Sequence, residues 1–206
     1  PHMPTGTPPE RENLKRLIKL CQEKNIMLCH DNPYSLVLNQ EDPFSIFQLT
    51  QGKENLIELN SLSKSHNMAG WRIGMLLGKE EYVRSILRVK SNIDSGMFLG
   101  LQSAAIASLE NDSFFHDERN ETYKERRLWV EKIFKLLDIE FNQKQTGMFL
   151  WGKPKNANSP IEIEDFIDHC LKELKIFFTP GKIFGTNGQG YIRASLCVDL
   201  EDIKLA

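Results

Sequence analysis

Three short apolar runs, at residues 26–30, 56–60 and 73–77, lie between more polar segments in the first half of the chain. Apolar runs of this length are typical of strands buried on both faces, as in a parallel sheet covered by helices. The apolar spacing over residues 8–25 indicates a helix before the first run, and another helix is expected over 80–90. This order of elements predicts an α/β fold with a mostly parallel sheet, whose ligands bind at the carboxyl ends of the strands.

The pattern changes after residue 98, where a helix through residue 109 and a long charged helix over 113–137 are expected. One more helix, near 163–174, alternates with short strands. The four predicted strands lie at 139–142, 148–151, 176–179 and 191–197. This mixture predicts a smaller α+β unit in the second half of the chain.

Charge and composition limit the kinds of partner. The 206 residues are 40% hydrophobic and carry 26 basic against 28 acidic side chains, a formal net charge of −2. Such a balance gives no electrostatic basis for binding nucleic acid or a membrane surface. No apolar run approaches the roughly 18 residues of a membrane span. Four cysteines without zinc-ligand spacing are expected to be buried, reduced thiols, which fits the cytoplasm. The expected partners are small molecules or other subunits.

The segment 59–74, whose sequence is LNSLSKSHNMAGWRIG, holds the most chemistry in the chain. Lys64 stands at its centre, with Ser61 and Ser63 before it and Arg72 after it. A lysine amine can form a Schiff base with an aldehyde, and a phosphate is bound well by hydroxyls and a planar guanidinium. A solvated surface lysine is the alternative, but it does not explain the small and polar residues around Lys64. The segment predicts pyridoxal phosphate chemistry.

Four motifs, in the same order along the chain, carry a family resemblance. They are PTG at 4–6, DNPY at 31–34, SLSKSHNMAGWRIG at 61–74 and PGKIFGTNGQGYIRASLC at 180–197. With them the chain resembles the class I/II, fold type I, pyridoxal-phosphate-dependent aminotransferases. The resemblance implies that residues 1–112 are the C-terminal part of the cofactor-binding large domain. It further implies that 113–206 are the small C-terminal domain, with its last helix incomplete.

The resemblance assigns three residues to the reacting part of the cofactor. Lys64 would hold pyridoxal 5′-phosphate as a Schiff base. After the amino substrate displaces it, Lys64 would move a proton between the substrate's α-carbon and the cofactor's C4′ carbon. Asp31 would face the pyridine nitrogen and keep the ring protonated, so that the ring accepts electrons. Asp-Asn-Pro is also an ordinary turn sequence. Tyr34, whose hydroxyl would reach the cofactor's phenolic oxygen, favours the functional interpretation.

Two arginines would bind anionic groups. Arg72 and Ser61 would hold the cofactor phosphate, with Ser63 as a third ligand, since an arginine fork suits a phosphate. Ordinary loop polarity is the alternative for these residues. Arg193 would bind the α-carboxylate of the substrate and orient it for proton abstraction. An exposed strand arginine is the alternative there, and the resemblance decides for the substrate role.

Several other residues are interpreted more simply. The glycines of segment 181–190 are expected in turns, because no helix follows them as a phosphate-binding loop requires. Gly147, Phe149 and Trp151 resemble the substrate-side wall of the family, although Phe149 and Trp151 could equally fill a core. His30 and His66 have no partner with a matching spacing in the sequence and are interpreted as structural.

The predicted function is transfer of an amino group from an amino acid to a 2-oxo acid by a soluble cytoplasmic homodimer. Another fold type I enzyme, such as a carbon–sulfur lyase, a cyclopropane-forming synthase or a decarboxylase, is the alternative among enzymes. A non-catalytic fragment is the alternative from another class. Family members are about twice as long as this chain. We therefore expect an N-terminal half to complete the site and the isolated chain to be largely inactive.

One position departs from the family pattern. Met3 stands before Pro-Thr-Gly, where the family has an asparagine that donates to the cofactor's phenolic oxygen, and a thioether cannot donate. Tyr34 would then make this contact alone, so the Schiff base stays protonated to higher pH. We predict that Met3→Asn in the full-length protein lowers the pH at which the visible absorbance of the bound cofactor titrates. An unchanged titration midpoint would contradict this hypothesis.

Overall fold

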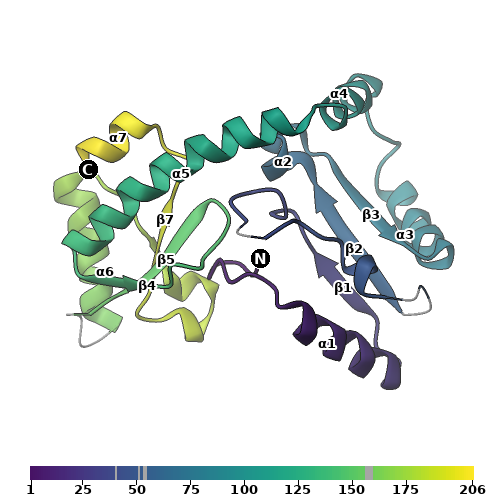
Figure 1. Cartoon of the computed structure of the whole chain (residues 1–206), viewed down its shortest axis with the longest axis horizontal. Helices are drawn as coiled ribbons and strands as arrows, with labels where there is room; N and C mark the ends of the chain where they lie inside the picture. Colours follow the sequence, from purple (N-terminus) through teal and green to yellow (C-terminus); the bar gives the residue numbers. More distant parts are fainter. Residues whose placement is uncertain (40, 51, 53–54, 156–159) are drawn as a thin grey trace. The chain divides into compact units, whose positions relative to one another are not determined.

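The computed structural model describes residues 1–39, 41–50, 52, 55–155 and 160–206. The chain divides into two compact units (Figure 1). One unit is Pro9–His116, and the other consists of Asp117–Ala206 together with Pro1–Pro8. The expected domain boundary between residues 112 and 113 stays a prediction.

The unit Pro9–His116 contains a three-stranded sheet in the order β1-β2-β3. The strands are β1 (Leu28–Asp31), β2 (Leu56–Ser61) and β3 (Gly74–Gly78). β1 is parallel to β2, but β3 is antiparallel to it. The expectation of a mostly parallel sheet was therefore too simple. A parallel return needs a crossover that is usually a full helix, whereas residues 62–73 form only short turns and bring the chain straight back.

The helices and turns of this unit are α1 (Arg11–Glu23), the 3₁₀ turns Ile46–Leu49 and Ala69–Trp71, α2 (Leu62–Ser65), α3 (Glu80–Ile93) and α4 (Leu99–Leu109). α1 and the turn Ile46–Leu49 pack on β2 around a buried cluster. Ile18 of α1, Ile46 and Leu56 of β2 form the buried cluster, with partly buried apolar residues around it. The apolar spacing that predicted the first helix thus places its buried face on the sheet.

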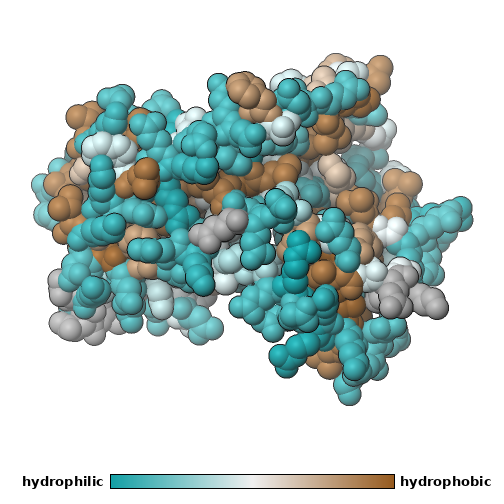
Figure 2. Space-filling view, in the orientation of Figure 1, coloured by the Kyte–Doolittle hydropathy of each residue, from teal (hydrophilic) through white to brown (hydrophobic). Residues whose placement is uncertain are grey.

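The last two helices of this unit expose much apolar surface. α4 has no buried residue although its sequence, LGLQSAAIASL, is almost entirely apolar or small. Ile93, Phe98 and Leu99 are 78%, 75% and 71% exposed. Figure 2 shows hydrophobic surface gathered over α4, at the upper right of the view. Apolar patches of this kind mark surfaces that contact other protein.

The second unit is built on a four-stranded antiparallel sheet in the order β4-β5-β7-β6. Its strands are β4 (Ile139–Phe141), β5 (Phe149–Pro154), β6 (Thr179–Pro180) and β7 (Ile192–Ser195). Its helices are α5 (Ser113–Leu136), which begins in the other unit, α6 (Pro160–His169) with the π-helical turn Cys170–Leu174, and α7 (Leu200–Leu205). Of the glycines expected in turns, Gly181 and Gly188 lie in the 3₁₀ turns Gly181–Phe184 and Thr186–Gly188, Gly185 lies between these turns, and Gly190 lies in a turn after them.

Aromatic packing joins α5 to the sheet of the second unit. The Phe134 ring is fully buried and meets the rings of Phe141 and Phe178 edge-on, at centroid distances of 5.7 and 6.3 Å. Gly152 of β5 lies under the same ring, and a Cβ there would come within 2.8 Å of Phe134 and 2.5 Å of Ile139. This contact requires glycine in the middle of the strand.

The first residues, Pro1–Pro8, pack on the turn between β4 and β5. The Thr146 N–H donates to the Gly6 carbonyl at 2.8 Å, and the Thr146 hydroxyl donates to the same oxygen at 3.2 Å. Gly6 has a φ of +66°, and a Cβ on it would lie 2.9 Å from the Thr146 carbonyl oxygen. Glycine is thus needed here on both counts, which gives the PTG motif a structural reason.

Two further expectations concern exposure and loops. All four cysteines are free, but only Cys21 and Cys170 are buried. The expectation of buried thiols was wrong for Cys29, on the outer strand of its sheet, and for Cys197, which follows β7.

The polar loop expected at 153–160 has its centre, 156–159, outside the described residues. In the described part of the chain, no helix combines the length and apolarity needed to cross a membrane.

Candidate functional site

Lys64 lies in α2, one helical turn past the end of β2. Ser61 caps this turn, because its side-chain oxygen accepts from the Ser63 N–H at 3.1 Å. The Ser61 hydroxyl also lies 2.9 Å from the Ser63 hydroxyl and 3.1 Å from the Ile73 carbonyl oxygen. The Lys64 side chain is half-buried, and its amine has no hydrogen-bond or ion-pair partner among the described residues. The amine is therefore available for chemistry.

A small apolar cluster holds the Lys64 segment in place. Leu62, Met68 and Ile73 are buried together, against partly buried residues of α4. The backbone closes on itself as well, since the Leu62 N–H donates to the Ile73 carbonyl at 3.2 Å and the Met68 N–H donates to the Leu62 carbonyl at 3.3 Å. A reactive side chain on such a rigid turn loses little freedom when it binds a ligand.

Arg72 follows this turn in an unusual backbone conformation. Its φ is 57° and its ψ 45°, the left-handed region that non-glycine residues seldom adopt. The side chain is exposed, and its Nη1 donates to the Ala69 carbonyl at 3.1 Å. Left-handed non-glycine residues cluster at functional sites, where the surrounding structure holds them in place. Arg72 therefore suits the predicted anion-binding role.

The end of β1 lies beside the start of the Lys64 segment. Because β1 and β2 are parallel, with Asp31 opposite Leu59, their carboxyl ends meet at the same edge of the sheet. The Asp31 side chain is exposed there, and no hydrogen bond or ion pair of its carboxylate occurs in the described part of the chain. Tyr34 follows in a turn and is half-buried. The fold thus brings both residues to the edge that carries Lys64.

Arg193 belongs to the other compact unit and has a different setting. It lies on β7, with Trp151 of β5 as its neighbour on one side and Thr179 of β6 on the other. Its guanidinium lies 4.1 Å from the centroid of the Phe149 ring and 4.7 Å from that of Phe184. Contacts of this kind orient a guanidinium without neutralising it. Arg193 is therefore not an ordinary exposed strand arginine.

The aromatic residues around Arg193 are themselves fixed. Trp151 is 8% exposed, stacks on Tyr191 at a centroid distance of 5.2 Å and meets Phe184 edge-on at 5.8 Å. The Gln145 side chain binds the Trp151 backbone twice, donating to its carbonyl at 2.6 Å and accepting from its N–H at 2.7 Å. Trp151 is thus buried in the core, and the Phe149 ring contacts the Arg193 guanidinium. Whether either residue lines the substrate side stays a prediction.

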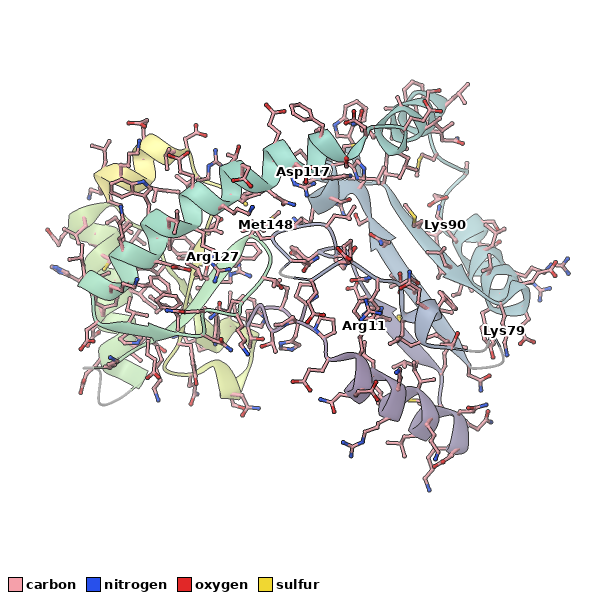
Figure 3. All side chains as sticks on the ribbon, in the orientation of Figure 1. Arg11, Lys79, Lys90, Asp117, Arg127 and Met148 are labelled. Atoms are coloured by element: carbon pink, nitrogen blue, oxygen red, sulfur yellow. The ribbon has the colours of Figure 1, made fainter. Side chains whose placement is uncertain are left out.

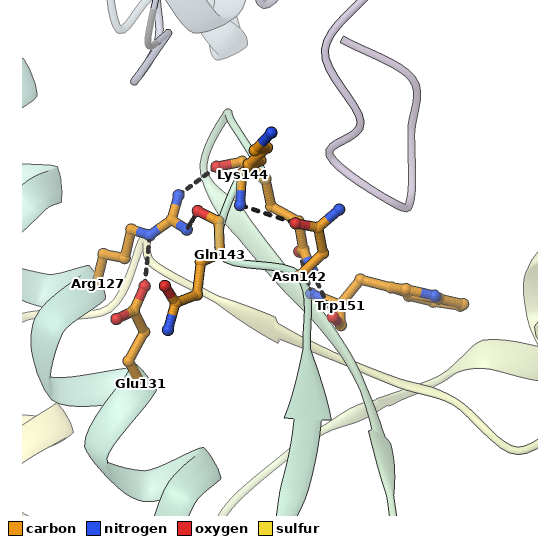
Figure 4. Close-up of polar contacts among 7 residues, drawn as sticks. Arg127, Glu131, Asn142, Gln143, Lys144 and Trp151 are labelled. Atoms are coloured by element: carbon orange, nitrogen blue, oxygen red, sulfur yellow. Dashed lines mark hydrogen bonds and ion pairs between the residues drawn. The ribbon is translucent and has the colours of Figure 1, made fainter.

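An arginine on α5 fixes the turn that contains Gln145 (Figure 4). Arg127 donates to the carbonyl oxygens of Gln145 and Gln143, the latter at 2.8 Å, and its Nε lies 2.8 Å from the Glu131 carboxylate. The Lys144 N–H also donates to the Asn142 side chain at 2.9 Å. The turn between β4 and β5 is thereby tied to the helix that packs beside it.

The motifs that contain Asp31, Lys64 and Arg193 are part of one family pattern. The family model for aminotransferase class I and II matches residues 1–206, the full length of the chain. The chain belongs to this family. Members of the class I and II aminotransferase family depend on pyridoxal phosphate.

Several relatives within the family are closely similar. LL-diaminopimelate aminotransferase from Aquifex aeolicus (strain VF5) is 36% identical over 202 residues, which are 98% of this chain and 51% of the relative. The enzyme of the same name from Nitratidesulfovibrio vulgaris (strain Miyazaki F) is 34% identical, over 100% of this chain and 53% of that one. The chain thus spans about half the length of the curated relatives it matches.

Solved structures agree with this assignment. An aminotransferase from Staphylococcus aureus superposes with a TM-score of 0.87 at 30% identity, covering 98% of this chain and 53% of that one. A probable N-succinyldiaminopimelate aminotransferase from Thermus thermophilus gives a TM-score of 0.88 at 29% identity, with coverages of 99% and 54%. The likeness extends along almost all of the chain.

The family motifs do not include Glu58, which the sequence analysis missed. Glu58 is 3% exposed in the interior of β2, and its Oε2 lies 3.0 Å from the His30 Nδ1. The same oxygen accepts from the Ile46 N–H at 2.8 Å and from the Ser45 hydroxyl at 3.2 Å. The structural role of His30 stays a prediction, but the expectation that it has no matched carboxylate was wrong. A glutamate inside the apolar run LIELN was the available signal.

The hydrogen bonds of Glu58 outweigh the effect of its burial. Burial alone raises the pKa of this carboxyl, because a charge is poorly solvated inside the protein. Hydrogen bonds from His30, the Ile46 N–H and Ser45, together with the charge of His30, bring the pKa below its ordinary value of 4.5. Glu58 is therefore ionised at neutral pH.

Glu58 should stabilise the fold in a pH-dependent way. We predict that Glu58→Gln lowers the free energy of unfolding at pH 7 by about 1–3 kcal/mol, because the neutral amide satisfies the same donors less well. Since the folded pKa lies below the unfolded one, this contribution is fully present above about pH 4.5 and is lost as the pH falls through the folded pKa. The stability difference between wild type and variant should narrow as the pH falls below about 4.5.

Urea denaturation at a series of pH values measures this difference. Glu12→Gln is the control, since Glu12 is an exposed carboxylate at 80% that pairs only with Lys15 among the described residues, and its loss should change stability at pH 7 by less than about 0.5 kcal/mol. A stability difference for Glu58→Gln that is absent at pH 7, or that does not shrink in acid, would contradict the role assigned to this carboxylate.

Proposed function

We propose that this chain is the lysine-bearing part of a pyridoxal-phosphate-dependent aminotransferase that moves an amino group from an amino acid to a 2-oxo acid. The observation that carries the proposal is the meeting of Lys64 and Asp31 at one edge of the sheet, where neither side chain has a partner among the described residues. The family, the aminotransferase names of the similar proteins and the motif order support the same activity.

The residues at this edge fit the chemistry of the cofactor. Lys64 offers a half-buried amine for covalent attachment, and the exposed Asp31 carboxylate suits a protonated ring nitrogen. Ser61, Ser63 and Arg72 supply two hydroxyls and a guanidinium, the donors that a phosphate group takes. Tyr34 supplies a phenolic hydroxyl from the turn after β1. The carbonyl carbon, ring nitrogen, phosphate and phenolic oxygen of the cofactor thus each have a candidate partner of matching chemistry.

Each side chain then has a distinct role in the reaction. When bound, pyridoxal phosphate supplies a carbonyl that condenses with amines and a ring that withdraws electrons. The Lys64 amine would hold the cofactor covalently and, when free, would act as the base that takes the proton from the substrate's α-carbon and delivers it to the C4′ carbon of the cofactor. Asp31 holds a proton on the ring nitrogen by its negative charge. Arg193 binds the α-carboxylate, with its guanidinium oriented by Phe149 and Phe184.

The substrate class follows from the relatives only in outline. Similar proteins carry the names LL-diaminopimelate and N-succinyldiaminopimelate aminotransferase. We propose a 2-amino acid with a second polar group at the far end of its side chain as the donor. Incubation of the full-length protein with such donors and 2-oxoglutarate, followed by product analysis, also separates transamination from lyase or decarboxylase chemistry.

We further propose that the full-length protein is a homodimer and acts in the cytoplasm. The apolar surface of α3 and α4 supports an interface with further polypeptide, and the free thiols fit a reducing compartment. Light scattering of the purified full-length protein tests the dimer. A mass corresponding to one copy at micromolar concentration would contradict it.

We predict that the Lys64 amine is the attachment point of the cofactor. The full-length protein is incubated with pyridoxal phosphate, reduced with borohydride and digested, and mass spectrometry should then place the adduct on Lys64. Lys64→Ala should abolish the adduct and lower the rate of transamination at least about a thousandfold, since it removes both the attachment point and the base.

A second lysine of the same unit provides the control. Lys90 lies on α3, is labelled in Figure 3 and pairs with Asp94 at 2.7 Å on the protein surface. Lys90→Ala should keep both the adduct on Lys64 and the activity. An adduct confined to other lysines, or full activity of the Lys64→Ala variant, would overturn the proposed function.

A further inference from the structure

Glu58 is a buried carboxylate that the proposed reaction does not use. A carboxylate inside a protein is costly unless its oxygens receive hydrogen bonds, and Glu58 meets this condition with one oxygen and three donors. The donors come from two separate segments. His30 is its neighbour in the parallel register of β1 and β2, whereas Ser45 and Ile46 belong to the connection between these strands.

Both segments are connected to the backbone around Asp31. His30 precedes Asp31 directly, and Asn32 follows it. The Asn32 N–H donates to the Leu59 carbonyl at 2.8 Å, and its side chain donates to the Phe44 carbonyl at 3.3 Å. On one side of Asp31, His30 is bonded to Glu58 itself. On the other side, Asn32 is bonded to Leu59, which directly follows Glu58, and to Phe44, which directly precedes the turn that Glu58 holds.

The turn held by Glu58 is itself rigid. Ile46 is fully buried in the cluster with Ile18 and Leu56, and the Ser45 hydroxyl caps the 3₁₀ turn by accepting from the Phe47 N–H at 3.2 Å. Arg11 projects from the start of α1 (Figure 3), and its guanidinium lies 4.1 Å from the centroid of the Phe44 ring. Glu58 thus links the end of β1 to an element that cannot easily move.

The Asp31 carboxylate depends on this link for its direction. It is exposed and has no hydrogen-bond partner in the described part of the chain, so no contact of its own orients it. Only the backbone of residues 30–32 determines where the side chain starts and which rotamers are open to it. A small displacement of that backbone would move the carboxylate away from a ligand, and displacements of about 1 Å can cost two orders of magnitude in rate.

We propose that Glu58 is a positioning residue, which acts through His30 and through the Ser45–Ile46 turn to aim the Asp31 carboxylate at the ring nitrogen of pyridoxal phosphate. The inference rests on the proposed function for the identity of the ligand. It assigns a role to a residue that lies outside the family motifs found in the sequence. Glu58 itself touches neither cofactor nor substrate.

A cofactor analogue separates this role from a general effect on folding. In the analogue, a CH group replaces the ring nitrogen of pyridoxal phosphate, so that Asp31 has no partner on the ring. Dissociation constants of both compounds are measured by fluorescence titration of the cofactor-free, full-length protein. Glu58→Gln should weaken the binding of pyridoxal phosphate about tenfold, the effect of one charge-assisted hydrogen bond, and that of the analogue less than about twofold.

Two further variants complete the experiment. Glu131→Gln removes a carboxylate that pairs with Arg127 on α5 and should leave both constants unchanged. Ser45→Ala removes one of the three donors to Glu58 and should show the same selectivity at about threefold. This variant also provides the test if Glu58→Gln does not fold. In an Asp31→Asn background, Glu58→Gln should change the dissociation constants of pyridoxal phosphate and of the analogue by the same factor.

The outcomes distinguish the two proposals. If Glu58→Gln weakens the binding of both compounds equally, or of neither, the positioning role is overturned. The borohydride-trapped adduct on Lys64 would still support the proposed function in that case. Absence of the borohydride-trapped adduct on Lys64 of the wild-type protein would overturn the proposed function, and the positioning role with it.

Discussion

The parallel register of β1 and β2, in which Asp31 lies opposite Leu59, is the constraint on which the candidate site depends. Parallel strands end at the same edge of a sheet, so the turn after β1 and the turn after β2 must open side by side. Asp31 ends β1 and Tyr34 lies in the turn after it, whereas Ser61 ends β2 and is followed in α2 by Ser63 and Lys64. One backbone pairing therefore collects groups that are about 30 residues apart in the sequence.

A buried ionisable pair lies between the same two strands, β1 and β2. Glu58 and His30 form this cross-strand pair, which is largely shielded from water, and the exposed Asp31 directly follows His30. The buried carboxylate is satisfied by donors from the protein, whereas Asp31 and Lys64 are left without protein partners among the described residues. The internal hydrogen bonds of this unit thus hold the buried carboxylate and not the exposed one.

Much of this arrangement could be predicted from the sequence. The short apolar runs located all three strands of the first sheet, and the polar residues after them located the candidate site. The direction of β3 was not predicted, because the apolar run 73–77 has the same appearance in either direction, and only the shortness of the connection 62–73 decides it. The pairing of Glu58 with His30 was missed because it spans 28 residues and depends on the strand register.

The second unit shows the same limits. Its strands and helices follow the predicted order, since short apolar runs and helical spacing are local signals. The setting of Arg193 between the rings of Phe149 and Phe184 depends on contacts between segments that are distant in the sequence. The packing of Pro1–Pro8 on Thr146 is likewise non-local, since 140 residues separate Gly6 from its partner. Local patterns therefore predicted the elements, and long-range hydrogen bonds and ring contacts decided the environment of the functional residues.

In the proposed enzyme, the edge formed by β1 and β2 binds pyridoxal phosphate through Lys64 and Asp31. A crystal structure of the full-length protein grown with the cofactor tests it most directly. We expect continuous electron density between the Lys64 Nζ and the cofactor, with an Asp31 carboxylate oxygen about 2.7–3.0 Å from the ring nitrogen. Density that joins the cofactor to another lysine, or a ring nitrogen beyond hydrogen-bond distance of Asp31, would contradict it.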